Sequence, residues 1–249
     1  MSVFKILFGI EEKEVRSCCV VMPLIAPGIL EQCGVGKLAC GRLYAAASNS
    51  HLTVIAARVG AGFVGDAVLY LKDTGCRTVF LFGSCGLVKQ TARLHIGATV
   101  VPSSCRAQES FSRTLAGARI PAGTVSPDAR LYAAFRRFAA RKAVGVRCLT
   151  VASLKLEEQA LPEYLKAGIE AVDMECSAFF AAAAHAGLRS LALFYAGDIL
   201  KVKPFYREQR AAERHALTSG IRTTADLLIG FAAEASAHNY QVGEGLPKK

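Results

Sequence analysis

The chain has 249 residues, of which 52% are apolar and 20% charged, a composition that excludes a disordered protein and leaves enough sequence for a buried core. Its apolar runs reach only about ten residues, so we expect no membrane partner. The formal net charge is +10, but Lys and Arg stand singly or in short clusters without interleaved aromatic residues. We therefore expect no nucleic-acid partner, and attraction to an anionic small molecule explains the charge equally well.

Cysteine and histidine usage points to a reducing compartment. The nine cysteines are an odd number without a Cys-x-x-Cys pair, which is typical of reduced thiols in the cytoplasm. The five histidines show no metal-binding spacing, so we expect neither a metal nor another cofactor. The N-terminal segment is too short and too soon acidic to be a secretory signal.

The first half of the chain alternates short apolar runs with turn residues. Two runs, residues 3–10 and 18–24, each qualify as the first strand, and the pattern does not decide between them. The elements that follow are closed by Gly, Pro or Asn-Ser. They are a short helix at 29–33, a hairpin of strands 42–47 and 52–57, a helix at 63–74, a buried strand at 77–82, and a strand at 96–101 that Pro102 ends.

The second half begins with a polar stretch, residues 103–127, that predicts loops. Helix and strand patterns then alternate up to a loose tail at about 240–249. They predict a helix at 128–142, a strand at 146–152, a short helix at 157–167, a helix ending at His185, a strand at 190–195 and a final helix at 208–234. Because no repeat, linker or low-complexity block interrupts the chain, we expect one α/β domain over residues 1–249.

A glycine-rich segment, residues 60–65, matches the Gly-x-Gly-x-x-Gly pattern between a predicted strand and a predicted helix. A dinucleotide site would also need an acidic residue about twenty positions later. That place holds the segment 82–85, which contains no acid. We therefore prefer a glycine turn that lets the backbone approach a small ligand.

Two carboxylates, Asp173 and Glu175, precede an apolar helical run at 176–184. Burying a carboxylate costs several kcal/mol unless it is paired, whereas the helix dipole returns only about 0.3–1 kcal/mol. One exposed acid would be enough for the dipole. The second acid suggests a functional role, with helix capping as the alternative.

Two further motifs follow predicted buried strands. The segment 83–86, Gly-Ser-Cys-Gly, offers backbone N–H groups and a hydroxyl to an anion, or is simply a tight turn. Asp198 follows an apolar strand and is either a turn former or a proton donor whose pKa burial would raise. Arg214 on the last helix is placed to reach Asp198, or forms a structural ion pair.

The ordered set of these motifs resembles the superfamily of purine nucleoside phosphorylases and uridine phosphorylases, which includes the methylthioadenosine nucleosidases. The resemblance extends over roughly residues 20–230. The motifs on which it rests are Gly60-Ala61-Gly62, Gly83-Ser84-Cys85-Gly86, Val172-Asp173-Met174-Glu175, Gly197-Asp198 and Ala211-Ala212-Glu213-Arg214. The resemblance implies a single-domain, three-layer α/β fold with a central mixed β-sheet.

The resemblance also implies roles for residues around a nucleoside. Glu175 would hydrogen-bond the ribose hydroxyls, Met174 would pack on the sugar and Asp173 would support their segment. Asp198 would protonate the purine ring at N7, and Arg214 would assist that proton transfer. General acid catalysis of this kind contributes on the order of 10²–10⁴ in rate.

For phosphate, the resemblance implies Ser84 and Gly83 with the amides of their loop. Arg42 would reach a phosphate across a subunit interface, which implies a homo-oligomer, either a dimer or a hexamer. The arginine that precedes the Gly-Ser loop in the family is replaced by Leu81. Arg58 is the candidate for a replacement phosphate ligand.

Other departures bear on the nucleophile and the base. The family's first-strand Gly-Asp-Pro motif is replaced by residues 22–28, and residues 153–156 provide no aromatic side chain to stack on the base. Glu11 and Glu12 lie in a segment similar to one in the nucleosidases that positions water.

The expected activity is therefore cleavage of a nucleoside, purine favoured, by phosphate as co-substrate, giving free base and ribose 1-phosphate. The alternatives are a hydrolytic nucleosidase and a nucleoside-binding module without turnover.

Overall fold

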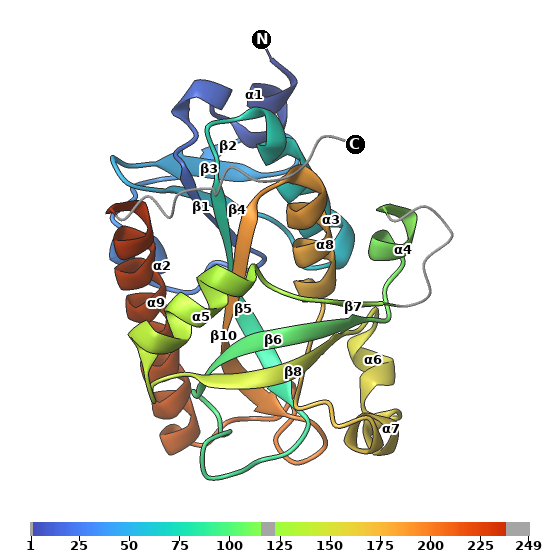
Figure 1. The fold of residues 1–249 in the computed structure, drawn as a ribbon. Helices are drawn as coiled ribbons and strands as arrows, with labels where there is room; N and C mark the ends of the chain where they lie inside the picture. Colours follow the sequence, from blue (N-terminus) through green and yellow to red (C-terminus); the bar gives the residue numbers. More distant parts are fainter. Residues whose placement is uncertain (1, 116–122, 238–249) are drawn as a thin grey trace.

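The computed structural model describes residues 2–115 and 123–237, and its strands form one sheet in the order β10-β6-β8-β9-β5-β1-β4-β3-β2. β7 (Thr124–Val125) pairs with β6 off this path. The sheet contains parallel and antiparallel pairs and has helices on both faces (Figure 1). The expected mixed sheet and three-layer α/β fold are therefore confirmed.

The N-terminal half of the sheet is built on buried parallel strands. β1 (Cys18–Met22) lies between β4 (Thr53–Ala56) and β5 (Thr78–Leu87). β3 (Ala45–Ser48) pairs antiparallel with β4, which confirms the predicted hairpin, and β2 (Ala39–Cys40) follows at the edge.

The C-terminal half of the sheet closes on itself, because β10 pairs with both β5 and β6. The ring consists of β5, β9 (Ala171–Asp173), β8 (Val144–Thr150), β6 (Thr99–Ala107) and β10 (Arg189–Ile199). Within it, Gly86 of β5 is opposite Asp198 on one side and Val172 on the other. The two acidic motifs of the sequence therefore lie on either side of one glycine.

The helices form two layers, one on each side of the sheet (Figure 1). α3 (Ala61–Tyr70), α4 (Phe111–Leu115) and α8 (Cys176–Ala186) lie on one side, and α2 (Ile29–Gln32), α5 (Ala129–Ala139) and α9 (Ala211–Ala237) on the other. Successive side chains of β1 point to opposite faces, so Val21 packs into the first core and Val20 into the second. This two-sided burial explains why the central strands are apolar throughout.

Short helices complete the described chain. α7 (Leu161–Lys166) packs with the end of β8 around a small third core, and α6 (Leu154–Glu157) precedes it in the chain. α1 (Val3–Phe8) and the 3-10 turn Glu12–Glu14 precede β1, and the 3-10 turn Leu71–Asp73 extends α3. The first of the two candidate runs is thus a helix, and the second is the first strand.

Three predicted boundaries were wrong. Pro102 does not end its strand, because the pairing of β6 with β8 shifts register between Pro102 and Ser104 and the strand continues to Ala107. The region predicted as loops therefore contains part of β6, as well as α4 and β7, and its residues 116–122 lie outside the described residues. β5 and β10 also run past their predicted ends, since they pair with each other as far as Leu87 and Ile199.

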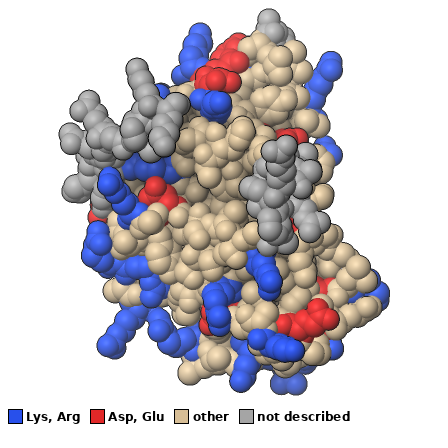
Figure 2. Space-filling model, turned by 45° about the vertical axis from the view of Figure 1, so that its right-hand side comes forward, with Lys and Arg blue, Asp and Glu red and all other residues tan. Residues whose placement is uncertain are grey.

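The surface charges and the cysteines have the following arrangement. On the face drawn in Figure 2, Lys and Arg lie mainly along the margins, and the middle is largely uncharged. All nine cysteines are free thiols. Among the described helices, none combines the length and hydropathy that crossing a membrane requires. The predicted tail, at about 240–249, lies outside the described residues.

Candidate active site

A cavity of about 330 Å³ opens where β5, β9 and β10 meet. Four carboxylates line it, and no Lys or Arg does among the described residues of its wall. The lining residues are Pro23, Leu24, Val59, Gly83, Ser84, Cys85, Gly86, Leu154, Glu157, Val172, Asp173, Met174, Glu175, Asp198 and Phe205. The Gly-Ser segment and both acidic motifs thus converge on a single site, although they are far apart in the sequence.

Glu175 lies immediately before the first residue of α8, and its side chain is only 6% exposed. Its carboxylate Oε1 accepts a hydrogen bond of 2.7 Å from the backbone N–H of Gly60. Gly60 has φ +120°, a backbone conformation that residues other than glycine rarely adopt. The glycine motif therefore turns the backbone to hold Glu175, a residue of the protein itself, and the predicted approach to a small ligand stays a prediction.

The surroundings of Glu175 affect its proton affinity. Burial raises the pKa of this carboxyl to about 7, although backbone hydrogen bonds from Gly60 and Met174 work in the opposite direction. Met174 beside it also lines the cavity. A buried carboxylate facing a cavity is suited to accept hydrogen bonds from ligand hydroxyls and to stabilise nearby positive charge.

Asp173 serves mainly to hold this segment in place. Its Oδ1 accepts a 2.7 Å hydrogen bond from the Thr150 hydroxyl, and its Oδ2 accepts backbone hydrogen bonds from Glu175 and Cys176. These donors connect β8, β9 and α8 at one carboxylate. Asp173 also lines the cavity, and its expected role beside a ribose stays a prediction.

Asp198 stands at the end of β10, opposite Gly86. A Cβ atom at position 86 would lie 3.1 Å from Asp198 Oδ1 and 2.8 Å from a Leu200 methyl, so glycine gives the carboxyl its space. Burial raises the pKa of Asp198 to about 6, with a smaller contribution from Glu158, while the Phe205 backbone N–H lowers it. The carboxyl can therefore carry a proton close to neutral pH.

The sequence analysis missed two residues of the cavity. Glu157, 5% exposed, has its pKa raised to about 7 by burial and by the negative charges of Asp198 and Glu158. Phe205 provides the aromatic wall that was not evident from residues 153–156. In the sequence, two adjacent glutamates are typical of a solvated surface. The tertiary structure nevertheless buries Glu157 in the cavity wall.

The predicted phosphate segment is present but lacks a cation. Gly83 and Ser84 line the cavity, and Ser84 is exposed. Gly83–Gly86 belongs to β5 and is not a loop after the strand, so its backbone groups take part in the sheet. Leu81, which stands in place of the family's arginine, is fully buried in the core.

None of the three predicted arginines lines the cavity. Arg42 is exposed at the turn between β2 and β3, and Arg58 lies over the ring of Phe63, 5.5 Å from its centroid. Arg214 is exposed on α9, and its guanidinium donates to the carbonyl of Gln209. The expected assistance of Arg214 to Asp198 is therefore not seen within one chain.

The N-terminal glutamates also have other partners. Lys5 Nζ lies 2.7 Å from Glu11 Oε1, and the Ser2 hydroxyl donates to Glu12 over 2.8 Å. Neither glutamate is part of the cavity wall.

We expect Glu157→Gln to stabilise the protein at pH 8 but not at pH 4. A carboxyl whose pKa is raised on folding binds more protons folded than unfolded, so stability falls as pH rises from about 4.5 to about 7. Allowing for water in the cavity, the amide should add about 1–2 kcal/mol at pH 8. Urea unfolding at the two pH values measures the difference.

The matched control for this prediction is Glu163→Gln, on the exposed side of α7. It should change stability by less than about 0.5 kcal/mol at either pH. An equal effect of both variants at pH 8 would show that net charge, and not the buried carboxylate, causes the stabilisation.

Comparison with known proteins supplies a family for this geometry. The model of the phosphorylase superfamily matches residues 27–228. A search of curated proteins found no significant match.

Solved structures with similar folds include three nucleoside-cleaving enzymes. Uridine phosphorylase from Vibrio fischeri ES114 superposes with a TM-score of 0.74 at 21% identity, covering 90% of this chain and 94% of that one. Purine nucleoside phosphorylase from Toxoplasma gondii, in complex with immucillin-H, has a TM-score of 0.75 at 16% identity and coverages of 96% and 99%. The 5′-methylthioadenosine/S-adenosyl homocysteine nucleosidase of Campylobacter jejuni has a TM-score of 0.69 at 11% identity and coverages of 88% and 99%.

Proposed function

This chain belongs to the phosphorylase superfamily, and from that premise we propose that it cleaves the N-glycosidic bond of a nucleoside, with water as the attacking group. The observation that supports the proposal is the cavity in which Asp198 and Glu175 face a common space without a Lys or Arg in its described wall. The similar structures named above include both phosphorylases and a nucleosidase, so the choice of nucleophile is argued from the cavity.

The two carboxylates have complementary tasks in such a reaction. A purine is a poor leaving group unless its ring is protonated. Asp198 can supply that proton, because it holds one up to a pH of about 6. The ribose becomes positively charged as the bond breaks, and the Glu175 carboxylate stabilises that charge while accepting hydrogen bonds from the hydroxyls. Asp173 and Gly60 hold Glu175 in position.

Water is favoured as nucleophile because of the charges around the cavity. Two like charges about 5 Å apart repel by about 3 kcal/mol at an effective dielectric constant of about 20. A phosphate dianion next to Glu175 would meet this repulsion without a compensating cation from the described wall. Neutral water enters the same space without such a cost.

Phosphate is the second candidate for the nucleophile, and two observations support it. Ser84 offers its hydroxyl at the cavity wall, and Arg42 lies exposed where another subunit can meet it. In a homo-oligomer, a dimer or a hexamer, a neighbouring Arg42 would supply the missing positive charge. Phosphorolysis would then give free base and ribose 1-phosphate.

Purine is the base that the cavity suits best. Glu157 lies close enough to Asp198 for their charges to interact, so two carboxyls face the region where a leaving base receives its proton. One of them can donate to a ring nitrogen while the other accepts from an N–H group. Phe205 provides an aromatic surface beside them.

The test is release of free base from a panel of nucleosides, with and without inorganic phosphate. We expect a purine nucleoside to be cleaved without phosphate, giving ribose, and the rate to change less than about twofold when phosphate is added. Liquid chromatography of base and sugar products measures both reactions. Arg42→Ala serves as the matched variant and should leave the phosphate-free rate unaltered.

Strict dependence on phosphate, lost in Arg42→Ala, would replace water by phosphate in the proposal. Binding of nucleosides without any base release would show the third alternative, a nucleoside-binding module without turnover.

A further inference from the structure

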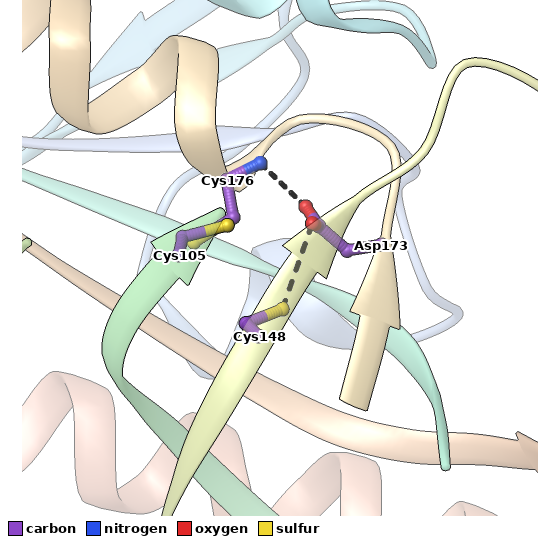
Figure 3. Close-up of side chains that lie close together, drawn as sticks. All are labelled: Cys105, Cys148, Asp173 and Cys176. Atoms are coloured by element: carbon purple, nitrogen blue, oxygen red, sulfur yellow. Dashed lines mark hydrogen bonds between the residues drawn. The ribbon is translucent and has the colours of Figure 1, made fainter. Parts of the chain in front are cut away.

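A cluster of three thiols and a carboxylate lies inside the protein (Figure 3), and its carboxylate, Asp173, also lines the candidate active site. The thiol cluster consists of Cys105, Cys148, Cys176 and Asp173. Its donor atoms all lie within 4.8 Å of one another, and its four residues are 0%, 1%, 0% and 6% exposed. The proposed reaction uses none of the three sulfurs.

Strand register explains how distant segments of the chain meet here. Cys105 of β6 and Cys148 of β8 are direct partners in a parallel pair, so their side chains point to the same face. Asp173 ends β9, which pairs with β8, and Cys176 is the first residue of α8. In Figure 3 the side chains from all four elements converge on a common space.

The distances are close to those of a tetrahedral metal site. With Zn–S bonds of about 2.3 Å, neighbouring sulfurs in such a site are about 3.8 Å apart. Cys148 Sγ lies 3.7 Å from Asp173 Oδ1, already near the separation of two ligands on one ion. The remaining pairs need to approach by about 1 Å at most, which small side-chain rotations achieve.

The surroundings orient the carboxylate as the second shell of a metal site does. The Thr150 hydroxyl donates to Asp173 Oδ1, and Thr150 Oγ1 in turn accepts from the backbone N–H of Ser177 over 2.8 Å. Asp173 Oδ2 is held by two backbone N–H groups at the start of α8. That helix end also favours the negative charge that thiolate ligands bring.

We propose that the thiol cluster binds one Zn²⁺ ion through the sulfurs of Cys105, Cys148 and Cys176 and one oxygen of Asp173. The donor set is soft and buried, and all four coordination positions come from protein, which characterises a structural site and not a catalytic one. Binding replaces three S–H protons by the metal, so three protons are released to solvent. The bound ion would join β6, β8, β9 and α8 directly below Glu175.

The experiment uses the full chain with its thiols reduced in metal-free buffer. Zn²⁺ and Co²⁺ are titrated, and metal content is measured after gel filtration. We expect one ion per chain, sulfur-to-cobalt charge-transfer absorption, and a higher melting temperature with Zn²⁺ because only the folded site binds tightly. The assay does not depend on catalysis, so its failure is distinct from failure of the proposed function.

Single variants locate the site. Cys148→Ser and Cys105→Ser should each weaken Zn²⁺ binding by at least about 100-fold, and Thr150→Val by about 10–100-fold through loss of the carboxylate's support. Cys40→Ser is the control, because Cys40 is the exposed cysteine. It should retain one ion per chain, the same absorption and the same affinity.

Each of the following results would overturn the proposal. They are reduced wild-type protein that takes up no metal, binding that Cys148→Ser leaves unchanged, and binding that Cys40→Ser abolishes. If the core variants fail to fold, the cobalt spectrum of the wild-type protein decides alone: absence of sulfur-to-cobalt bands excludes thiolate ligation.

Discussion

Asp198→Asn should lower kcat for purine nucleoside cleavage at least about 100-fold, because the amide cannot give a proton to the departing base. The substitution keeps the size of the side chain beside Gly86, and the Phe205 N–H still finds an oxygen acceptor. Substrate binding should change much less than turnover. Steady-state kinetics on the folded variant, verified by circular dichroism, measures the loss.

The leaving group provides the control for this variant. A 4-nitrophenyl riboside releases a stable anion without protonation, so its cleavage by Asp198→Asn should fall less than about tenfold. Loss of activity to the same extent on both substrates would indicate a damaged cavity and not a missing acid. Retention of wild-type turnover on the nucleoside would remove Asp198 from the role of general acid.

The pH dependence of kcat/KM is a second test of the proton that Asp198 donates. Asp198, whose pKa is raised to about 6, acts in its protonated form, whereas Glu175, whose pKa is raised to about 7, acts as the carboxylate. The kcat/KM of the wild-type protein should therefore be greatest between about pH 6 and 7 and fall about tenfold per unit of pH above that range as Asp198 loses its proton. The Asp198→Asn variant should lack this falling limb. A limb that persists in the variant would belong to another group.

Glu175→Gln should lower kcat/KM by about 10²–10³-fold, since the amide loses the negative charge that stabilises the developing ribosyl cation and that strengthens the hydrogen bonds from the ribose hydroxyls. The amide oxygen can still accept the hydrogen bond from the Gly60 N–H, which preserves the turn. The free energy of unfolding should not decrease at pH 8, because a buried carboxylate is replaced by a neutral group. Kinetics and urea unfolding together separate catalysis from stability.

A dideoxynucleoside tests how Glu175 acts. Without ribose hydroxyls the wild-type protein has already lost its hydrogen bonds to the sugar, so the ratio of wild-type to Glu175→Gln rates should shrink at least about tenfold. An undiminished ratio would mean that Glu175 acts on charge alone. Unchanged kcat/KM of Glu175→Gln on the normal nucleoside would exclude a catalytic role and leave helix capping at the start of α8 as the role of Glu175.

Local patterns were sufficient for the layers of the fold. The start of the buried strand β5, the glycine turn at Gly60 and the helix after Glu175 each follow from the spacing of apolar residues and from turn residues within about ten positions. The ordered motifs predicted a site that includes Ser84, Glu175 and Asp198, and these residues do line one cavity. The strand, the turn and the helix depend on short stretches of chain, so the sequence alone determined them, whereas the common site was predicted only through the resemblance of the ordered motifs to a known family.

What only the tertiary structure decided depends on pairing between distant strands. The closure of β10 onto β5 extends both strands and places Asp198 and Glu175 on either side of Gly86. Packing turns Glu157 into the cavity and leaves Arg42, Arg58 and Arg214 outside its wall. Side-chain direction and burial, which set the pKa of each carboxyl and the choice of nucleophile, depend on these long-range contacts and are not encoded in any single motif.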